Sequence, residues 1–171
     1  MKTMEAGSIN TLTVQKRKLL VLDLDETLVH TSYSPILGAE YKSKKGLFYL
    51  YERPHLKDFL DRFFVEYDLA IWSASKAEYV KWVIKSTVLC RYEYLFVNTR
   101  RNCQRILGKN GSFEYHKDIT PYLSHYDKVI MLDDYPELVM PIQYCLKVPE
   151  YRGGEDDFLS IFNYELLKNV L

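Results

Sequence analysis

The stretch KLLVLDLDETLVHT, from Lys18 to Thr31, decides the fold predicted for this chain. Its first part, Lys18–Asp23, is a short and almost continuously apolar run, which is typical of a strand buried on both faces of a parallel sheet. The run leads directly into Asp23, Asp25 and Glu26. Because crowded carboxylates at the end of a buried strand need compensation, the stretch predicts a polar site as well as a core element.

Further apolar runs follow at intervals, separated by segments with helical spacing. We expect strands at Asp68–Trp72, Glu93–Val97, Lys128–Leu132 and Ile142–Val148. Strands that alternate with helices favour an α/β domain with a Rossmann-like, mainly parallel sheet flanked by helices and joined by right-handed crossovers.

The segment between the first two of these strands predicts only small structures. A strand at Gly46–Tyr51 is expected to pair with residues around Ala39–Lys42, which makes a small β insert. Pro54 is expected at the first position of a helix. Ser75 to Glu78 match a capping box, with Ser75 as the N-cap of the next helix.

The composition predicts one soluble domain. The chain has 171 residues, 47% of them hydrophobic, and 23 basic against 23 acidic side chains, so no basic surface for nucleic acid is expected. Three widely spaced cysteines (Cys90, Cys103 and Cys145) favour a reducing compartment. We expect an intracellular protein without membrane association, with residues 1–15 as a flexible lead-in, residues 16–171 as a single domain, and a monomer as the default state.

Polar residues follow the predicted strands in a particular order. Asp23 and Asp25 come after the first strand, Ser73 after the second, and Asp133 with Asp134 after Lys128–Leu132. In open α/β sheets, ligands bind outside the carboxyl ends of the strands. Converging carboxylates of this kind are compensated naturally by Mg²⁺, a hard cation that prefers oxygen ligands.

Each of these residues taken alone has a structural explanation. Asp23 could form a turn or cap a helix, Ser73 could be a solvated hydroxyl, and Lys117 a surface charge, while Asp133–Asp134 could form a turn. Their common position at one sheet edge favours a functional site.

The order DxDxT, Ser, Lys and Asp-Asp resembles the haloacid dehalogenase superfamily of aspartate-nucleophile phosphotransferases. The resemblance is closer to its RNA polymerase II C-terminal-domain (CTD) phosphatases, including the small CTD phosphatases and NLI-interacting-factor-like proteins. The matching blocks are DLDETLVH (Asp23–His30), ERPHLKDFL (Glu52–Leu60), WSASKAEYV (Trp72–Val80), RRNC (Arg100–Cys103), YHKDI (Tyr115–Ile119) and MLDDYP (Met131–Pro136). The resemblance implies the haloacid dehalogenase fold, with no large cap domain.

The resemblance also implies roles for the acidic residues. Asp23 matches the nucleophile that forms an aspartyl-phosphate, and Asp25 matches the general acid that protonates the leaving alcohol and then activates water. Mg²⁺ would be bound by Asp23, the backbone carbonyl of Asp25, and Asp134. Asp133 remains an alternative to Asp134 as the direct ligand.

Four further residues match groups that contact the phosphate. Ser73 and Lys117 match the side chains that hold the phosphoryl oxygens. Thr27 is expected to orient the Asp23 loop, and Arg100 matches a phosphate-proximal arginine.

The function implied by the resemblance is a Mg²⁺-dependent protein serine/threonine phosphatase. The small insert leaves an open site, which suits a phosphorylated protein or peptide, and the family suggests the RNA polymerase II CTD as substrate. An alternative is a catalytically silent phosphatase-like binding module. Silent proteins that resemble this domain have a degraded DxDxT motif, whereas Asp23 and Asp25 are intact here. The sequence leaves the choice between nucleus and cytoplasm open.

Overall fold

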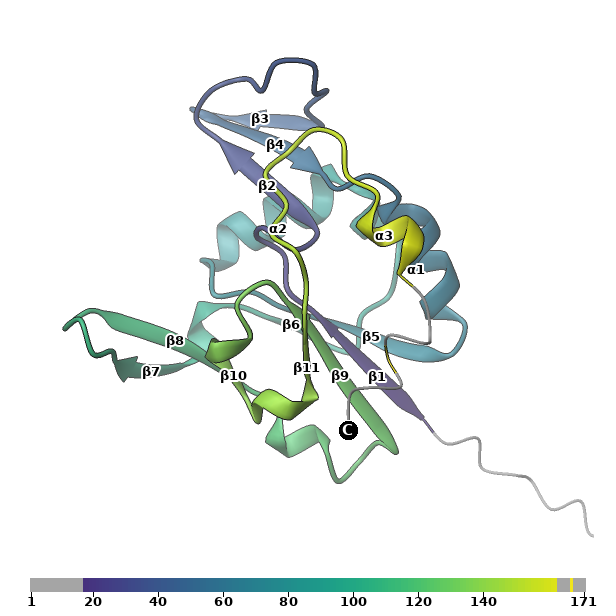
Figure 1. The fold of residues 1–171 in the computed structure, drawn as a ribbon, viewed down its shortest axis with the longest axis vertical. Coiled ribbons are helices and arrows are strands. Elements are labelled where there is room, and N and C mark those ends of the chain that lie inside the picture. The colour runs from purple at the N-terminus through teal and green to yellow at the C-terminus, as the bar shows by residue number, and fades with distance from the viewer. Residues whose placement is uncertain (1–16, 163–166, 168–171) are drawn as a thin grey trace, which may run out of the picture.

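A five-stranded parallel sheet forms the centre of the protein in the computed structural model, which describes residues 17–162 and 167. The strand order is β11-β9-β1-β5-β6, and every neighbouring pair is parallel. Figure 1 shows β1 crossing the middle of the molecule. The strands are β1 (Lys18–Leu22), β5 (Tyr67–Trp72), β6 (Val97–Asn98), β9 (Lys128–Asp133) and β11 (Cys145–Lys147). The predicted α/β class with a mainly parallel sheet is therefore confirmed.

The central position of β1 explains its continuous apolar sequence. Its residues pair with β5 on one side and β9 on the other, so that Leu20 lies opposite both Leu69 and Ile130. The last four residues of β1 are buried because both faces of the sheet are covered. The predicted strand at Glu93–Val97 is shorter than expected: only Val97 and Asn98 form β6, although Leu95 still donates a backbone hydrogen bond to Leu69.

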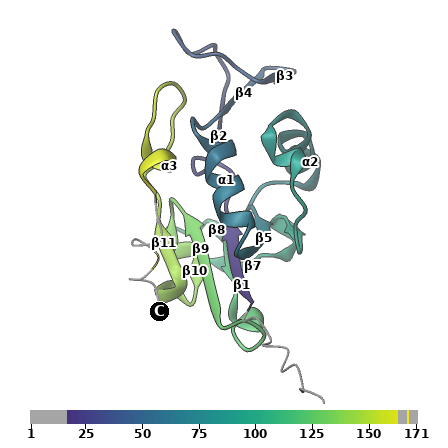
Figure 2. The same ribbon diagram turned by 90° about the vertical axis from the view of Figure 1, so that its right-hand side faces the viewer.

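One face of the sheet is covered mainly by α1 (Leu56–Phe64), α2 (Ala77–Ser86) and α3 (Phe158–Ile161), as the side view in Figure 2 shows. Phe59, Leu60 and Phe63 of α1 are buried against Leu20 and Leu22 of β1. The opposite face packs Leu19, Val21, Trp72 and Met131 against Ile119 and Val139.

The start of α1 differs from the prediction. The helix begins at Leu56, and Pro54 lies in the preceding turn. His55 is the N-cap and has a left-handed backbone with φ of 63°. Phe64, the last residue of α1, has an exposed fraction of 46%.

A three-stranded antiparallel insert follows β1 and lies at the top of Figure 1. Its strands are β2 (Val29–Ser32), β3 (Ser43–Lys45) and β4 (Phe48–Glu52), in the order β2-β4-β3. The small insert is confirmed, but β4 pairs with β2 and β3 and not with a strand at Ala39–Lys42. Between β1 and β5 the chain forms only this insert and α1, so no large cap domain lies there.

A second small sheet of three strands returns the chain to the central parallel sheet. It has the order β10-β8-β7, formed by β7 (Gln104–Leu107), β8 (Phe113–Asp118) and β10 (Val139–Met140). Strands β7 and β8 pair antiparallel as a hairpin, which projects to the left in Figure 1. The C-terminal end of β8 returns to the body of the protein and carries Lys117 with it.

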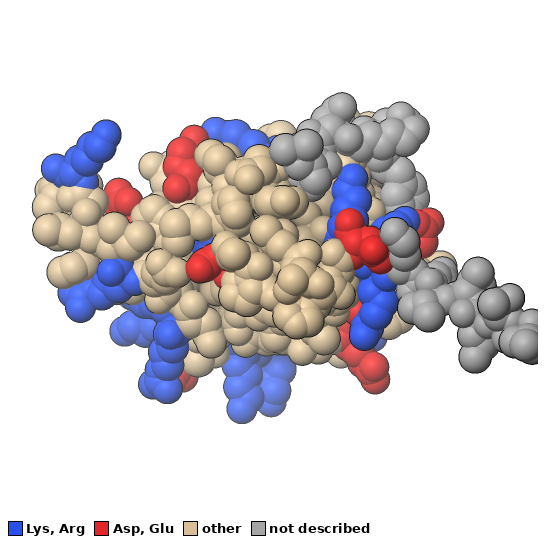
Figure 3. Space-filling model, turned by 90° about the horizontal axis from the view of Figure 1, so that it is seen from below, with Lys and Arg blue, Asp and Glu red and all other residues tan. Residues whose placement is uncertain are grey.

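Short 3₁₀ helices make most of the remaining connections: Val88–Arg91, Arg100–Asn102, Thr120–Tyr122, Pro136–Leu138 and Ile142–Tyr144. Seen from below, Lys and Arg side chains stand mainly around the edge of the molecule, and the centre of this face is largely uncharged (Figure 3). In the described ranges, none of the helices has the length and apolar character needed to cross a bilayer. The predicted lead-in at residues 1–15 lies outside the described residues.

Candidate active site

The chain leaves the sheet directly after Asp23. The Asp23 N–H still donates to Leu132 O at 3.0 Å, and then the N–H groups of Leu28 and Val29 both turn back to Leu24 O. Glu26 has φ of 60° in this turn. The tight turn keeps the DxDxT segment at the carboxyl end of β1.

Lys117 forms a buried ion-pair network with two aspartates. Its Nζ donates to Asp23 Oδ1 at 2.5 Å and to Asp133 Oδ2 at 2.7 Å. All three side chains are buried, with residue exposures of 4%, 5% and 2% for Lys117, Asp23 and Asp133. A buried charge needs a partner of opposite sign, and Lys117 of β8 is the cation that compensates both Asp23 after β1 and Asp133 of β9.

The network shifts the pKa values of its members. Burial raises the pKa of Asp23, and although Lys117 acts in the other direction, the charges of Asp133 and Asp25 raise it further. Burial opposes the charged form of Lys117, but Asp23 and Asp133 outweigh it and raise the Lys117 pKa. The raised pKa favours the charged form of Lys117 in the site.

Asp134 is joined to the DxDxT turn through Thr27. The Thr27 hydroxyl donates to Asp134 Oδ1 at 3.2 Å and accepts from the Asp134 N–H at 3.1 Å. Burial, followed by the charge of Asp133, raises the pKa of Asp134. Thr27 thus ties the turn after β1 to the turn after β9.

Asp25 accepts hydrogen bonds from three hydroxyl groups. Ser75 Oγ donates to Asp25 Oδ2 at 2.8 Å, and Ser73 Oγ donates to the same oxygen at 3.2 Å. The Tyr79 hydroxyl donates to Asp25 Oδ1. Burial and the neighbouring Asp25 raise the pKa of Tyr79, so that its hydroxyl keeps its proton and remains a donor.

The predicted capping box at Ser75 is wrong. The N-cap of α2 is Lys76, which makes no side-chain cap hydrogen bond. The Ser75 hydroxyl is directed to Asp25, and its N–H donates to Ser73 Oγ at 3.0 Å. Ser75 therefore donates to Asp25, whereas in a capping box its hydroxyl oxygen would accept a backbone N–H of the helix.

Arg100 lies beside this group but is bound to other partners. Its Nε donates to Ala74 O at 2.7 Å, and its guanidinium lies over the ring of Tyr115, 4.8 Å from the centroid. The structure brings Asp23, Asp25 and Lys117 to one edge of the sheet together with Ser73, Thr27, Asp133 and Asp134. Arg100 lies near that edge, where its side chain is hydrogen-bonded to the backbone of the loop that follows Ser73.

Three residues contact the aspartates or their turn in ways that the sequence does not predict. Ser75, expected as a cap, and Tyr79 both donate to Asp25. Arg53 is 1% exposed, and its Nη1 donates to Thr27 O at 2.9 Å. Arginine is rarely buried without a partner, and the sequence signal that could have indicated Arg53 is its place in the matching block ERPHLKDFL.

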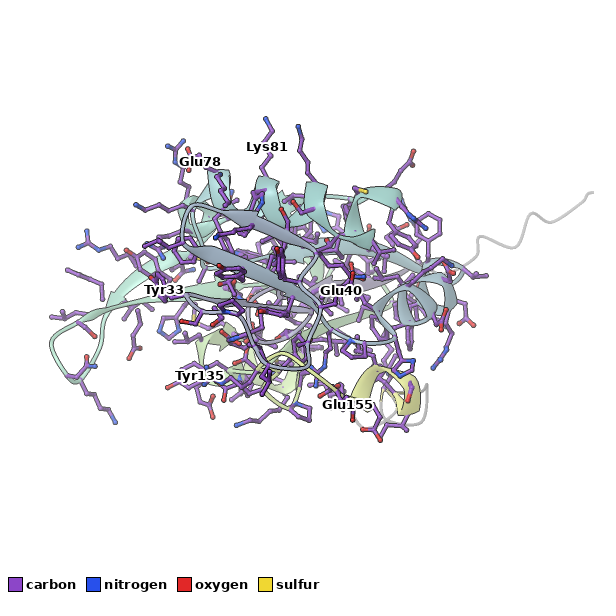
Figure 4. All side chains as sticks on the ribbon, turned by 90° about the horizontal axis from the view of Figure 1, so that it is seen from above. Tyr33, Glu40, Glu78, Lys81, Tyr135 and Glu155 are labelled. Carbon is purple, nitrogen blue, oxygen red and sulfur yellow. The ribbon has the colours of Figure 1, made fainter. Side chains whose placement is uncertain are left out.

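Exposed side chains surround the edge on which the site lies. Figure 4, seen from above, shows Tyr33 from the insert, Glu78 from α2 and Tyr135 from the turn after β9 at its periphery. An apolar pocket of about 340 Å³ lies between the insert and α2, and Phe48, Tyr79 and Trp82 form much of its wall. Tyr79 thus contributes its ring to the pocket and its hydroxyl to Asp25.

The carboxylates fit a divalent cation. Asp23, Asp133 and Asp134 each offer an oxygen, and these oxygens lie within 4.8 Å of one another. Carboxylate oxygens are the ligands that Mg²⁺ prefers. Asp133 is engaged by Lys117 and by the Tyr135 N–H at 2.9 Å, whereas Asp134 is oriented through Thr27 alone among the described side-chain hydrogen bonds.

The parallel sheet, with paired aspartates after β1 and a lysine and a second aspartate pair at the same edge, defines a haloacid dehalogenase-type fold. The family model for the NLI interacting factor-like phosphatases matches residues 18–170, and the chain belongs to this family.

Relatives and solved structures agree with this assignment. Phosphatase Herzog of Drosophila melanogaster is 31% identical over 69% of this chain and 41% of its own length. Human CTD small phosphatase-like protein is 30% identical over 74% of this chain and 49% of its own length. The structure of Fcp1, an essential RNA polymerase II CTD phosphatase, superimposes with a TM-score of 0.61 at 20% identity, over 91% of this chain and 48% of that one. The chain thus spans about half the length of these relatives.

Proposed function

We propose that the chain is a Mg²⁺-dependent protein serine/threonine phosphatase that acts through an aspartyl-phosphate intermediate. The observation that carries the proposal is the buried contact of Asp23 with Lys117, beside the oxygens of Asp133 and Asp134. A carboxylate beside a fixed cation and a metal-binding group can accept a phosphoryl group, whose charge these neighbours neutralise. Membership in a phosphatase family supports this chemistry.

In the first step, the carboxylate oxygen of Asp23 that is not bound to Lys117 attacks phosphorus. A bond forms between this oxygen and phosphorus, and the bond to the serine or threonine oxygen breaks. Asp25 donates its proton to the leaving oxygen. Lys117, Ser73 and Arg100 stabilise the phosphoryl oxygens.

In the second step, water attacks the phosphorus of the aspartyl-phosphate. Asp25, now ionised, accepts a proton from this water, and the bond between phosphorus and Asp23 breaks. The products are inorganic phosphate and the original carboxylate of Asp23, so both steps use the same pair of aspartates.

Mg²⁺ would be held by Asp23, the Asp25 carbonyl and Asp134, and would supply positive charge that lets a phosphate dianion approach a carboxylate. Asp133 is proposed to orient Lys117 and not to bind the metal, because its carboxylate accepts a hydrogen bond from Lys117. Thr27 orients Asp134.

The proposed substrate is a phosphorylated serine or threonine in a protein. The insert between β1 and β5 is small, so the edge is open to an extended peptide. One relative is named a CTD small phosphatase-like protein, and the fold is similar to that of an RNA polymerase II CTD phosphatase. We propose peptides with the repeat of the RNA polymerase II CTD as the first candidates. The protein is proposed to act in the nucleus or cytoplasm.

Hydrolysis of an aryl phosphate, measured with and without Mg²⁺, tests the proposal. Wild type is expected to turn over only with Mg²⁺, and Asp23→Asn to lose at least about 10³-fold in kcat, since nucleophile losses reach this scale and beyond. Asp61→Asn, a change at an exposed aspartate of α1, is the control and should keep wild-type turnover. A wild type without metal-dependent turnover would overturn the proposal in favour of a silent binding module.

A beryllium fluoride adduct gives an independent test of the nucleophile. Mass spectrometry or ¹⁹F spectra with Mg²⁺ should show the adduct on wild type and on Asp61→Asn, but not on Asp23→Asn. An adduct that persists in Asp23→Asn would remove Asp23 from the role of nucleophile.

A further inference from the structure

We infer that Tyr79 and Ser75 are positioning residues for Asp25, holding its carboxyl group for proton transfer to the leaving oxygen. The inference rests on the proposed function, because it concerns the acid–base step of that reaction. It starts from the hydrogen bonds of Asp25, whose Oδ1 accepts from the Tyr79 hydroxyl and whose Oδ2 accepts from the Ser75 hydroxyl.

The hydroxyl protons can be assigned from the geometry. Tyr79 has a single proton and directs it to Asp25, so the contact of 3.4 Å between Tyr79 Oη and Thr31 Oγ1 must have Thr31 as donor. Ser73 Oγ accepts the Ser75 N–H and directs its own proton to Asp25. One carboxyl group is thus held on both oxygens by donors from two elements, α2 and the loop after β5.

The three hydroxyl groups have different parts in this arrangement. Ser73 lies at the end of β5 and is assigned to the phosphate, so its contact with Asp25 at 3.2 Å is long enough to be exchanged for a substrate oxygen. Ser75 at 2.8 Å and Tyr79 remain with Asp25. When the Ser73 hydroxyl donates to a phosphate oxygen instead of to Asp25, the hydroxyls of Ser75 and Tyr79 keep the Asp25 carboxyl group in place.

Tyr79 is itself fixed on several sides. Its ring packs against Trp82 with a centroid distance of 5.8 Å, and Thr31 of β2 contacts its hydroxyl. A side chain held by packing on its own helix and by the insert can fix a partner accurately, which a mobile surface tyrosine cannot.

The amount of proton transfer that a reaction needs depends on its leaving group. An alkoxide or phenoxide must be protonated as it leaves, whereas a dinitrophenolate leaves without help. Loss of a group that positions the acid therefore lowers kcat/KM for poor leaving groups and spares good ones. A defect in folding or in phosphate binding lowers all of them alike.

The test measures kcat/KM with Mg²⁺ for a series of aryl phosphates whose leaving groups differ in pKa. Tyr79→Phe is expected to lose about 10-fold with phenyl phosphate and less than about 3-fold with dinitrophenyl phosphate, so its plot of log kcat/KM against leaving-group pKa is steeper. Ser75→Ala should shift the plot in the same direction. Because kcat/KM reports the steps up to phosphoryl transfer, hydrolysis of the intermediate does not mask the effect.

Tyr92→Phe is the matched control, because Tyr92 donates to the carboxylate of Asp61 at 2.6 Å on the surface of α1. It should give the wild-type slope. A second comparison uses Asp25→Asn: Tyr79→Phe should add no further loss in that background if it acts through Asp25.

The outcomes separate the two proposals. An active wild type whose slope is unchanged in Tyr79→Phe and Ser75→Ala would overturn the positioning role and leave the phosphatase proposal intact. Additive losses in the Asp25→Asn background would also overturn it. A wild type without turnover would overturn both proposals together.

Discussion

The guanidinium of Arg53 binds both carboxylate oxygens of Asp156, which lies 103 residues further along the chain. The two contacts are 2.8 Å and 2.9 Å, and the third donor of Arg53 goes to Thr27 O. A bidentate pair of this kind is among the stronger polar contacts in proteins. It links the segment that precedes α3 to the DxDxT turn.

Asp156→Ala is expected to destabilise the protein by about 3 kcal/mol, because it leaves the charge of Arg53 buried without its carboxylate partner. Urea unfolding followed by tryptophan fluorescence would measure the difference. The matched control is Glu150→Ala, which removes the partner of Arg152 in an exposed pair and should cost less than about 1 kcal/mol. Equal losses in the two variants would contradict the structural importance of the Arg53 pair.

Asp133 and Asp134 should differ in their effect on Mg²⁺. Asp134→Asn is expected to raise the Mg²⁺ concentration for half-maximal turnover by at least about 10-fold, since it removes a proposed ligand. Asp133→Asn should instead lower kcat at saturating Mg²⁺, because Lys117 loses one of its two carboxylate partners. A Mg²⁺ titration of the rate measures both, and the reverse pattern would make Asp133 the direct ligand.

Without metal, the stability of the protein should fall as pH rises from about 4. Burial raises the folded-state pKa of Asp23 above its usual 3.8, and Asp134 is shifted in the same direction. A raised acid pKa gives stability that is fully present below the unfolded value and is lost as pH rises through the folded value. Mg²⁺ binds the ionised carboxylates, so it should restore stability at neutral pH and have little effect near pH 4.

Thermal unfolding across this pH range, with Mg²⁺ and with a chelator, checks the prediction. Asp23→Asn should flatten the metal-free pH dependence, because an amide does not titrate. A Mg²⁺ effect of the same size at both ends of the range would show that the ion does not compete with protons at these carboxylates.

The two phenylalanines at the end of α1 should differ strongly in their contribution to stability. Phe63 is buried among Phe59, Tyr67 and Phe162, and Phe63→Ala is expected to cost about 3–5 kcal/mol. Phe64 is 46% exposed and packs on Tyr92, so Phe64→Ala should cost about 1 kcal/mol. Chemical denaturation compares them, and similar losses would contradict the observed orientation of the helix.

The sequence predicts the sheet well wherever burial is continuous. Residues 19–22 of β1 and 129–132 of β9 are apolar because both faces of each strand are covered, so their sequence pattern predicts the central strands correctly. Glu93–Val97 has the same appearance, but it lies at the edge of the sheet, where only Val97 and Asn98 complete the ladder. The extent of pairing at an edge depends on the neighbouring loops, which a local pattern does not contain.

The parts of the site that were missed depend on long-range contacts. A serine followed three residues later by glutamate predicts a capping box, but Asp25, 50 residues earlier, takes the Ser75 hydroxyl. Tyr79 and Arg53 likewise acquire their roles from Asp25 and Thr27. By contrast, Asp23, Lys117 and Asp133 could be placed together because each follows or approaches the same sheet edge.

The separation between Asp23 and Lys117 has a consequence for how the protein is made. The two residues are 94 positions apart and their contact is buried, so a chain emerging from the ribosome presents its nucleophile well before the cation that accompanies it. β9, which lies between β11 and β1 in the finished sheet, is also made late. The proposed chemistry therefore becomes available only after most of the chain has been synthesised, and a prematurely terminated product would carry the DxDxT motif without its activity.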